Sequence, residues 1–259
     1  MREFNCADHW DGAAERYEKT AHPYTTRYVD AALAHVPLTP ASRVLDVAAG
    51  TGALALAAAR AGAQVLATDF SPGMVARIAA KAVSNVEARV MDGQALDVPD
   101  EAFDAVFSMF GVFMFPDWRR GLAEMARVTR PGGYGVAAVW QDRGAGAFML
   151  LGRLIRHLFP DRDLAPMPEA MAILGTAECL ADELVKAGYR DPRIDHVTRD
   201  FDLDMAMLED ADALFGSSPD WTGLDTAQKD RIIAELRRMA GDRAHLPIPS
   251  TALLGIARR

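Results

Sequence analysis

VLDVAAGTGALA, at residues 44–55, is the stretch of sequence that decides the fold. Its first four residues are mostly apolar and suit a buried parallel strand. Gly50 and Gly52 let the backbone turn tightly and approach a ligand closely. The Ala/Leu run that follows has strong helix propensity. Strand, glycine turn and helix together predict the opening unit of a nucleotide-binding α/β domain, with the ligand at the helix N-terminus.

A second apolar stretch, QVLATD at residues 64–69, predicts a strand that ends in an acid. At this spacing from Gly52, a doubly wound sheet places the Asp69 carboxylate beside the first turn, within reach of ribose hydroxyls. Two cofactor classes fit such a unit, the nicotinamide dinucleotides and S-adenosylmethionine.

The dinucleotide class fits the sequence poorly. Its fingerprint positions read Ala48, Gly50 and Ala53, so the first glycine is missing. No Tyr is followed four residues later by Lys, the pair that a short-chain dehydrogenase would need. The segments RVMDGQAL (89–96) and FDAVFS (103–108) instead continue the strand pattern with an acidic turn.

With these segments, the chain resembles the class I S-adenosylmethionine-dependent methyltransferases, in the small-molecule group that includes the ubiquinone and menaquinone methyltransferases. The resemblance covers about residues 42–141 and implies a Rossmann-like sheet of seven strands. That sheet is mostly parallel with an antiparallel last strand, and helices cover both faces. The segments that carry the resemblance are VLDVAAGTGALAL (44–56), VLATDFSPGMV (65–75), MDGQALDVPDEAFDAVFSMFGVFMFPD (91–117) and WRRGLAEMARVTRPGGYGVAAVW (118–140).

The pattern along the chain predicts N-terminal helices, and the resemblance implies that they form a lid over residues 1–37, followed by a Rossmann-like core over residues 38–259. A helical insertion at about 203–248 is expected at the carboxyl edge of the sheet, as a substrate-side cap. The lid should hold two helices separated at Pro23, with Asp8 or Asp11 as the first N-cap.

Alternating periodicity predicts the remaining elements. Arg130-Pro131-Gly132-Gly133 is expected to form a turn before the fifth strand, and a loop is expected around Pro166 and Pro168. The predicted strands are 43–47, 64–68, 86–91, 103–108, 134–140, 193–201 and 250–258. The predicted helices are 52–61, 72–82, 118–129, 144–159 and 177–187, the last capped by Thr176.

The resemblance implies roles for individual cofactor-binding residues. Asp69 would accept the ribose hydroxyls, and Asp92 the adenine amine. Asp46 would face the methionine amino group, although fixing the glycine turn is an alternative, and Met74 could equally be ordinary core. The full set is Tyr17, Asp46, Ala48, Gly50, Gly52, Asp69, Phe70, Met74, Asp92, Gly93, Gln94 and Ser108. Ala48 departs from the family pattern, which usually has glycine there.

Substrate-side residues are expected after the fourth strand and in the lid. Phe110 and Phe113 either line an apolar pocket or belong to the core, and Gln141 ends the fifth strand. Trp10 and Tyr24 are the candidates from the lid.

No catalytic residue is identified from the sequence. Methyl transfer needs mainly alignment and exclusion of water, so a strong catalytic group is not obligatory. The weak candidates for a base are His22, His157 and His245, and a structural or solvated role is the alternative for each. Gln141 is a further weak catalytic candidate, because it could reach the acceptor. The six histidines show no metal-ligand spacing, so no metal is expected.

Composition and charge exclude other classes. The 259 residues carry 28 basic and 36 acidic side chains, a net charge of −8, which disfavours a nucleic-acid substrate. The arginines of 119–130 are expected on the solvated face of a helix. The chain has two cysteines, no apolar leader and no apolar run of membrane-spanning length, so we expect a cytoplasmic protein with no membrane partner. The oligomeric state is left open between a monomer and a homodimer.

The sequence therefore predicts an S-adenosylmethionine-dependent methyltransferase that acts on O, N or C of a small, fairly apolar molecule. One alternative keeps the cofactor but catalyses a non-methylating, cyclisation-type reaction. A non-catalytic binding module and a nicotinamide oxidoreductase are the further alternatives.

Overall fold

The computed structural model describes residues 6–141, 147–164, 169–216 and 218–259. The chain divides into two compact units. The first unit consists of Met1–Asp142, Pro168–Val197 and Ala252–Arg259, and the second consists of Arg143–Met167 and Thr198–Thr251. The predicted helix start at Gly144 and the predicted loop at Pro166 and Pro168 lie outside the described residues.

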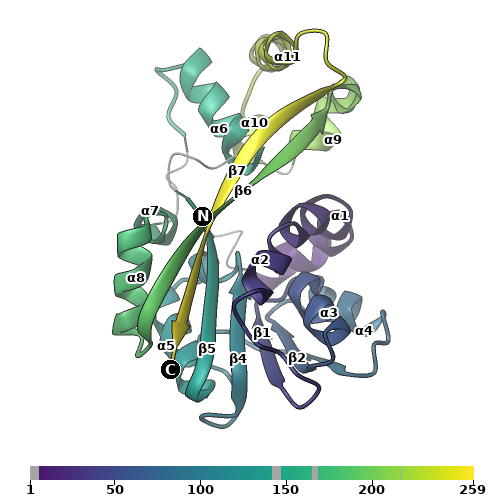
Figure 1. Ribbon diagram of the computed structural model, residues 1–259. Helices are drawn as coiled ribbons and strands as arrows, with labels where there is room; N and C mark the ends of the chain where they lie inside the picture. Colours follow the sequence, from purple (N-terminus) through teal and green to yellow (C-terminus); the bar gives the residue numbers. More distant parts are fainter. Residues whose placement is uncertain (1–5, 142–146, 165–168, 217) are drawn as a thin grey trace. The chain divides into compact units, whose positions relative to one another are not determined.

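Strands of the described residues form one seven-stranded sheet in the order β3-β2-β1-β4-β5-β7-β6 (Figure 1). Neighbours among β1 to β5 pair in parallel, whereas β7 pairs antiparallel with β5. This arrangement confirms the predicted fold class. The strands are β1 (Arg43–Val47), β2 (Gln64–Asp69), β3 (Val86–Val90), β4 (Phe103–Met109), β5 (Thr129–Trp140), β6 (Arg190–Asp204) and β7 (His245–Arg258).

Helices of the first unit cover the two faces of this sheet. The crossovers through α3 and α4 run outward from β1 toward β3, and the one through α5 runs the other way, so right-handed connections place α5 on the opposite face. The helices are α1 (Ala7–Thr26), α2 (Val29–Leu33), α3 (Ala53–Arg60), α4 (Pro72–Ala79), the 3-10 turn η2 (Val112–Met114), α5 (Trp118–Val128), α7 (Glu169–Leu174) and α8 (Ala177–Lys186).

The predicted break of the N-terminal helix at Pro23 is wrong. α1 continues through Pro23 and ends only at Thr26. A proline this close to the end removes one backbone hydrogen bond without interrupting a long ladder. The hydroxyls of Thr25 and Thr26 both donate to the carbonyl of His22, which satisfies an acceptor of the last turn.

The predicted caps of α1 and the predicted turn before the fifth strand are also corrected. Cys6 is the N-cap of α1 and makes no side-chain cap bond. Residues 130–133 lie within β5, where the register against β4 shifts between Phe103 and Ala105. Gly132 has a φ of 76° in this bulge, which glycine tolerates without strain. The Thr176 cap of α8 is confirmed, because its hydroxyl accepts from the Cys179 N–H.

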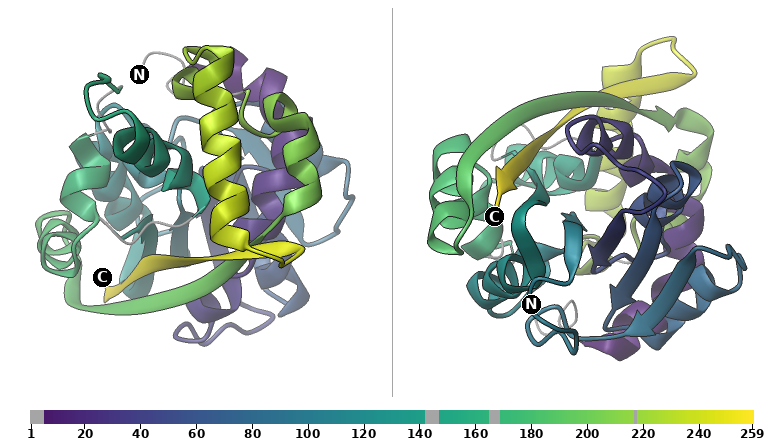
Figure 2. Two further views of the ribbon diagram at one scale, coloured as in Figure 1. Left: turned by 90° about the horizontal axis from the view of Figure 1, so that it is seen from above. Right: turned by 60° about the horizontal axis from the view of Figure 1, so that its bottom comes forward.

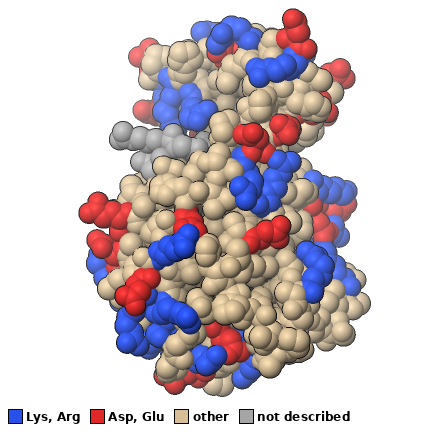
Figure 3. Space-filling view, viewed as in Figure 1, with Lys and Arg blue, Asp and Glu red and all other residues tan. Residues whose placement is uncertain are grey.

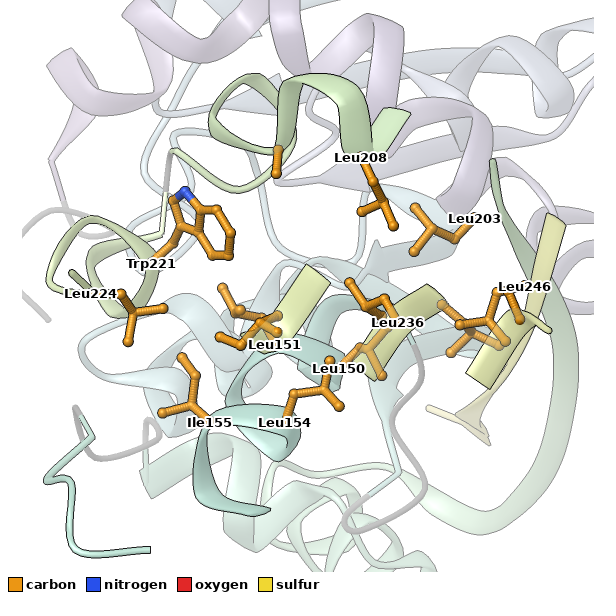
Figure 4. Packing of buried hydrophobic residues seen from close by; sticks show 14 residues of the cluster. Leu150, Leu151, Leu154, Ile155, Leu203, Leu208, Trp221, Leu224, Leu236 and Leu246 are labelled. Carbon is orange, nitrogen blue, oxygen red and sulfur yellow. The ribbon is translucent and has the colours of Figure 1, made fainter. Parts of the chain in front are cut away.

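The second unit has a hydrophobic core of its own (Figure 4). Figure 2 shows the long strands β6 and β7 running side by side into it. Trp221 is 1% exposed in this core, and its Nε1 donates to Asp212 at 2.6 Å. Its helices are α6 (Ala147–Leu158), η3 (Met205–Asp210), α9 (Ala211–Phe215), α10 (Pro219–Thr222) and α11 (Thr226–Ala240). The unit therefore contains α6 in addition to the 203–248 segment.

Charged side chains of both signs are interspersed on the face shown in Figure 3. Three arginines of the 119–130 region are held in ion pairs, Arg119 with Glu183, Arg127 with Glu124 and Arg130 with Asp104. Across the described residues, no helix is long and apolar enough to cross a membrane.

Candidate active site

The turn between β1 and α3 is left-handed at three positions. The backbone angle φ is 55° at Ala48, 55° at Gly50 and 87° at Gly52. A side chain makes this conformation costly, so Ala48 is the strained member. A Cβ added to Gly111 would lie 2.5 Å from the Ala48 Cβ. The missing side chain at Gly111 therefore makes room for the alanine.

Asp69, at the end of β2, holds this turn in place. Its Oδ2 accepts from the Gly50 N–H at 2.8 Å, and its Oδ1 accepts from the Ser71 N–H at 3.0 Å. Burial raises the pKa of Asp69, whereas the Ser71 and Gly50 N–H groups act in the opposite direction. A carboxylate has about four lone-pair sites, so each oxygen can also accept a ribose hydroxyl.

Two buried polar atoms lie at the ends of neighbouring strands with no hydrogen-bond partner among the described residues. They are Oδ1 of Asp46 in β1 and Oγ of Ser108 in β4. The other Asp46 oxygen accepts from the Ala55 N–H at 3.0 Å, so Asp46 also fixes the start of α3. Burial raises the pKa of Asp46 to about 8, and nearby Asp69 adds to the shift. An unpartnered buried carboxylate oxygen is a ready acceptor for a cationic group.

A cavity of about 20 Å³ borders Asp46 and the glycine turn. That volume holds about one water molecule. Its lining comes from α1, α2, β1, the glycine turn, α3 and β4, and consists of Tyr17, His22, Thr25, Val29, Asp46, Ala48, Ala49, Thr51, Ala53, Leu54 and Met109.

Tyr17 of α1 lies directly against the glycine turn. A Cβ added to Gly50 would meet the Tyr17 ring at 3.3 Å, so the ring would have to shift slightly, and the left-handed φ of Gly50 also favours glycine. Burial raises the pKa of Tyr17 to about 12, so its hydroxyl stays neutral. The ring of Trp10 contacts Tyr17 edge-on, with centroids 6.0 Å apart. The sequence analysis predicted Tyr17 as a cofactor contact and Trp10 as a substrate-side residue, and both roles remain predictions.

Asp11 of α1 binds the first turn of α4. Its Oδ1 accepts from the Ser71 hydroxyl and, at 2.7 Å, from the Gly73 N–H. A Cβ on Gly73 would lie 2.9 Å from the Asp11 backbone, so glycine permits this approach. Asp11 thus supports the N-terminus of α4, not that of its own helix.

Glu18 forms an ion-pair network between α1 and α4. Its carboxylate lies 2.8 Å from Arg77 Nε and 2.5 Å from Lys81 Nζ. Lys81 also donates to the Thr51 carbonyl of the glycine turn at 3.0 Å. His22, one turn further along α1, has its Nδ1 2.7 Å from the Thr51 hydroxyl.

The acidic turn after β3 is held by its own side chains. Asp92 is exposed, and its Oδ1 accepts from both the N–H and the Nε2 of Gln94 at 2.9 Å. Gln94 Oε1 in turn accepts from the Asp117 N–H at 2.8 Å, at the start of α5. A Cβ on Gly93 would lie 2.5 Å from the Phe115 ring. Adenine recognition by these three residues remains a prediction.

Phe70 and Met74 follow β2. Phe70 is half-buried directly after the strand, whereas Met74 is 2% exposed within α4. The burial of Met74 agrees with a core position, and contact of either side chain with adenine remains a prediction.

Four aromatic rings pack together at the carboxyl ends of β4 and β5. Trp140 lies between Phe110, 4.0 Å away at 17°, and Tyr24, 5.3 Å away at 14° (centroid distances and interplanar angles). Tyr28 packs edge-on against Trp140 at 5.4 Å. Phe110 has a φ of 62°, a strained conformation for an aromatic residue. Of the predicted substrate-side residues, Phe110 and Tyr24 therefore meet in one cluster.

The other candidates lie elsewhere. Phe113 is 3% exposed in η2, and Gln141 is half-buried directly after Trp140. His157 and His245 are exposed residues of the second unit. His22 is therefore the histidine candidate that borders the cavity beside Asp46.

Sequence reasoning missed several residues of this region. Glu18 and Lys81 are ordinary charged residues of amphipathic helices, and their pairing depends on how α1 meets α4. Trp140 could have been identified from the sequence, because it stands at the carboxyl end of a predicted strand, where ligands of α/β sheets bind.

The chemistry of the region fits S-adenosylmethionine. The unpartnered Asp46 oxygen suits an ammonium group, and Asp69 suits vicinal hydroxyls. Glycine in the turn lets a ligand approach the backbone closely.

Comparisons with known proteins agree with this geometry. Residues 44–133 match a family described as "Methyltransferase domain". A demethylmenaquinone methyltransferase of Corynebacterium efficiens is 37% identical over 164 residues, which is 60% of this chain and 70% of the relative. The crystal structure of the YcgJ protein of Bacillus subtilis has a TM-score of 0.60 at 19% identity, covering 90% of this chain and 98% of that one. The [4+2]-cyclase SpnF has a TM-score of 0.56 at 24% identity, covering 90% and 80%.

The two structural neighbours establish the fold, and the curated relative establishes the family. The glycine turn, Asp46 and Asp69 now have a common explanation. The chain belongs to the class I S-adenosylmethionine-dependent methyltransferases, of the menaquinone-methyltransferase type.

Proposed function

We propose that this enzyme transfers a methyl group to O, N or C of a small, fairly apolar molecule. The observation that carries the proposal is the ring cluster of Tyr24, Phe110 and Trp140 at the carboxyl ends of β4 and β5. Ligands of open α/β sheets bind at this edge, and aromatic side chains at that edge favour a flat or apolar acceptor. The interspersed surface charges offer no continuous basic track on the face of Figure 3.

The residues present would support methyl transfer by alignment. S-adenosylmethionine supplies a methyl group activated by the adjacent positive sulfur. Asp46 would hold the ammonium of the methionine part, and Asp69 the ribose, each on a rigid strand end. Tyr17 would exclude water from the glycine turn. No group in this proposal acts as a strong base.

A labelled methyl donor tests the proposal. The purified protein is incubated with S-adenosylmethionine labelled in the methyl group and with panels of small phenols, amines and carboxylates, alongside RNA and protein. We expect label in an apolar small molecule, together with stoichiometric S-adenosylhomocysteine. The Phe110→Ala variant should raise the KM of the acceptor much more than that of the cofactor.

Two outcomes would contradict the proposal. Label mainly in RNA or protein would exclude a small acceptor. Conversion of a substrate without S-adenosylhomocysteine release would instead identify the cyclisation-type alternative. The Asp69→Ala variant serves as the control, because label that persists unchanged in it does not come from this site.

A further inference from the structure

No residue near the cavity beside Asp46 has yet been assigned to the carboxylate of the methionine part of the cofactor. The methionine part of S-adenosylmethionine carries an ammonium and a carboxylate on the same carbon atom. If Asp46 holds the ammonium, the carboxylate must lie within a few bond lengths of it. A hydrogen-bond donor is therefore needed on the same cavity wall.

Among the side chains that line the cavity, His22 is best placed to donate. Its Nδ1 lies 2.7 Å from the hydroxyl of Thr51, a residue that is 0% exposed. When that hydroxyl donates to Nδ1, the proton of the neutral imidazole is on Nε2, which is then a donor. Burial lowers the pKa of His22, as does the charge of Lys81, while Glu18 opposes the shift, so the ring is neutral near pH 7.

The threonine hydroxyls beside it are already engaged. The Thr25 hydroxyl donates to the His22 carbonyl at 3.2 Å. The Thr51 hydroxyl is paired with His22 itself. Lys81 also donates to the Thr51 carbonyl, which holds Thr51 in place. The imidazole is therefore oriented by a residue of the core, although His22 itself belongs to α1.

We propose that His22 is a positioning residue whose Nε2–H binds the carboxylate of the methionine part of the cofactor. The proposal rests on the cofactor, not on the acceptor proposed above. Because His22 belongs to α1, the N-terminal helix would contact the amino-acid end of the cofactor directly. Closure of the lid is then favoured by ligands that carry the carboxylate and less by those that lack it.

A pair of ligands tests this assignment without any turnover. S-adenosylhomocysteine carries both charged groups, and its decarboxylated analogue, 5′-(3-aminopropylthio)-5′-deoxyadenosine, keeps only the ammonium. Calorimetric titration of His22→Ala should show S-adenosylhomocysteine affinity reduced roughly 10- to 100-fold, as for a lost hydrogen bond to a charged group. Affinity for the analogue should stay within about twofold of the wild type. The His22→Gln variant, which keeps an N–H donor, should recover part of the loss.

The matched control is His196→Ala, an exposed histidine of β6. It should leave both affinities unchanged within about twofold. Equal weakening of both ligands by His22→Ala would show a structural role, and an unchanged S-adenosylhomocysteine affinity would remove His22 from the site. Either result overturns the assignment and leaves the proposed methyl acceptor untouched.

Hydrogen exchange provides a second readout on the same proteins. S-adenosylhomocysteine should slow amide exchange in α1 more than the analogue does at equal saturation, and His22→Ala should abolish the difference. Equal protection of α1 by the two ligands in the wild type would contradict the coupling.

Discussion

The two ends of α1 contact the core in different ways. Between Asp11 and His22, polar side chains of α1 reach the glycine turn and α4 through Ser71, Lys81 and Thr51. At the other end the contact is aromatic, because Tyr24 stacks on Trp140.

This difference predicts different stabilities for the two ends of α1. Partly exposed ion pairs contribute about 1 kcal/mol or less each and are screened by salt, whereas a buried aromatic contributes several kcal/mol. We therefore expect α1 to open from its polar end, beside the cofactor turn, while its aromatic end stays packed. The following predictions test this contrast from the largest effect to the smallest.

The aromatic end is broken by Trp140→Ala. The side chain is 6% exposed and touches the rings of Tyr24, Tyr28 and Phe110. We expect the free energy of unfolding in urea to fall by about 3–5 kcal/mol, as for other large-to-small core changes. Trp10→Ala is the control, because that ring is only half-buried, and it should cost much less. A loss below about 1 kcal/mol at Trp140 would mean that the cluster does not anchor the lid.

The cofactor turn is broken by Asp69→Ala. The change removes the acceptor of the Gly50 and Ser71 N–H groups and the proposed partner of the ribose. Affinity for S-adenosylhomocysteine should weaken by roughly 1–3 kcal/mol in calorimetry. Asp97→Ala, at an exposed acid, is the matched control. Unchanged affinity in the Asp69 variant would remove this residue from the ribose site.

Cofactor affinity should also depend on pH through Asp46 of β1, whose pKa is raised to about 8 by burial and by Asp69. A bound ammonium favours the carboxylate form, so affinity for S-adenosylhomocysteine should rise up to about tenfold per pH unit below pH 8 and level off above it. Asp46→Asn should remove this rise.

The same shift has the opposite effect on stability. The folded chain keeps the Asp46 proton in the window from 3.8 to about 8, whereas the unfolded chain releases it. The contribution of this group to unfolding free energy therefore decreases as pH rises through that window. An affinity that is independent of pH from 6 to 8 would contradict the assignment of Asp46 to the ammonium.

The smallest effect is expected at the ion pairs of the lid. Glu18→Gln removes the charge that faces Arg77 and Lys81. Hydrogen exchange in the first half of α1 should become a few-fold faster, consistent with less than about 1 kcal/mol, while the residues around Tyr24 stay protected. High salt should reproduce the effect in the wild type. Uniform loss of protection along α1 would show that the helix opens as one piece.

Features that depend on residues close in sequence could be predicted from the sequence. They include the left-handed angles at Gly50 and Gly52, the position of Asp69 after its strand and, outside the cofactor site, the Thr176 cap of α8. The aromatic cluster around Trp140 could not be predicted in the same way, because Phe110 fits a pocket or a core equally well until its neighbours are known. Pro23 misled the helix boundary, because its effect depends on how close the helix end is.

The order and spacing of the motifs by themselves determined the fold class, the family and the cofactor. Strand, glycine turn and terminal acid are short patterns with one compatible backbone. The tertiary structure decided which distant side chains meet, as Asp11 does with Ser71, 60 positions away, and Tyr24 with Trp140. Such contacts depend on how whole helices and strands pack, and the same charged or aromatic residue suits many partners until that packing selects one.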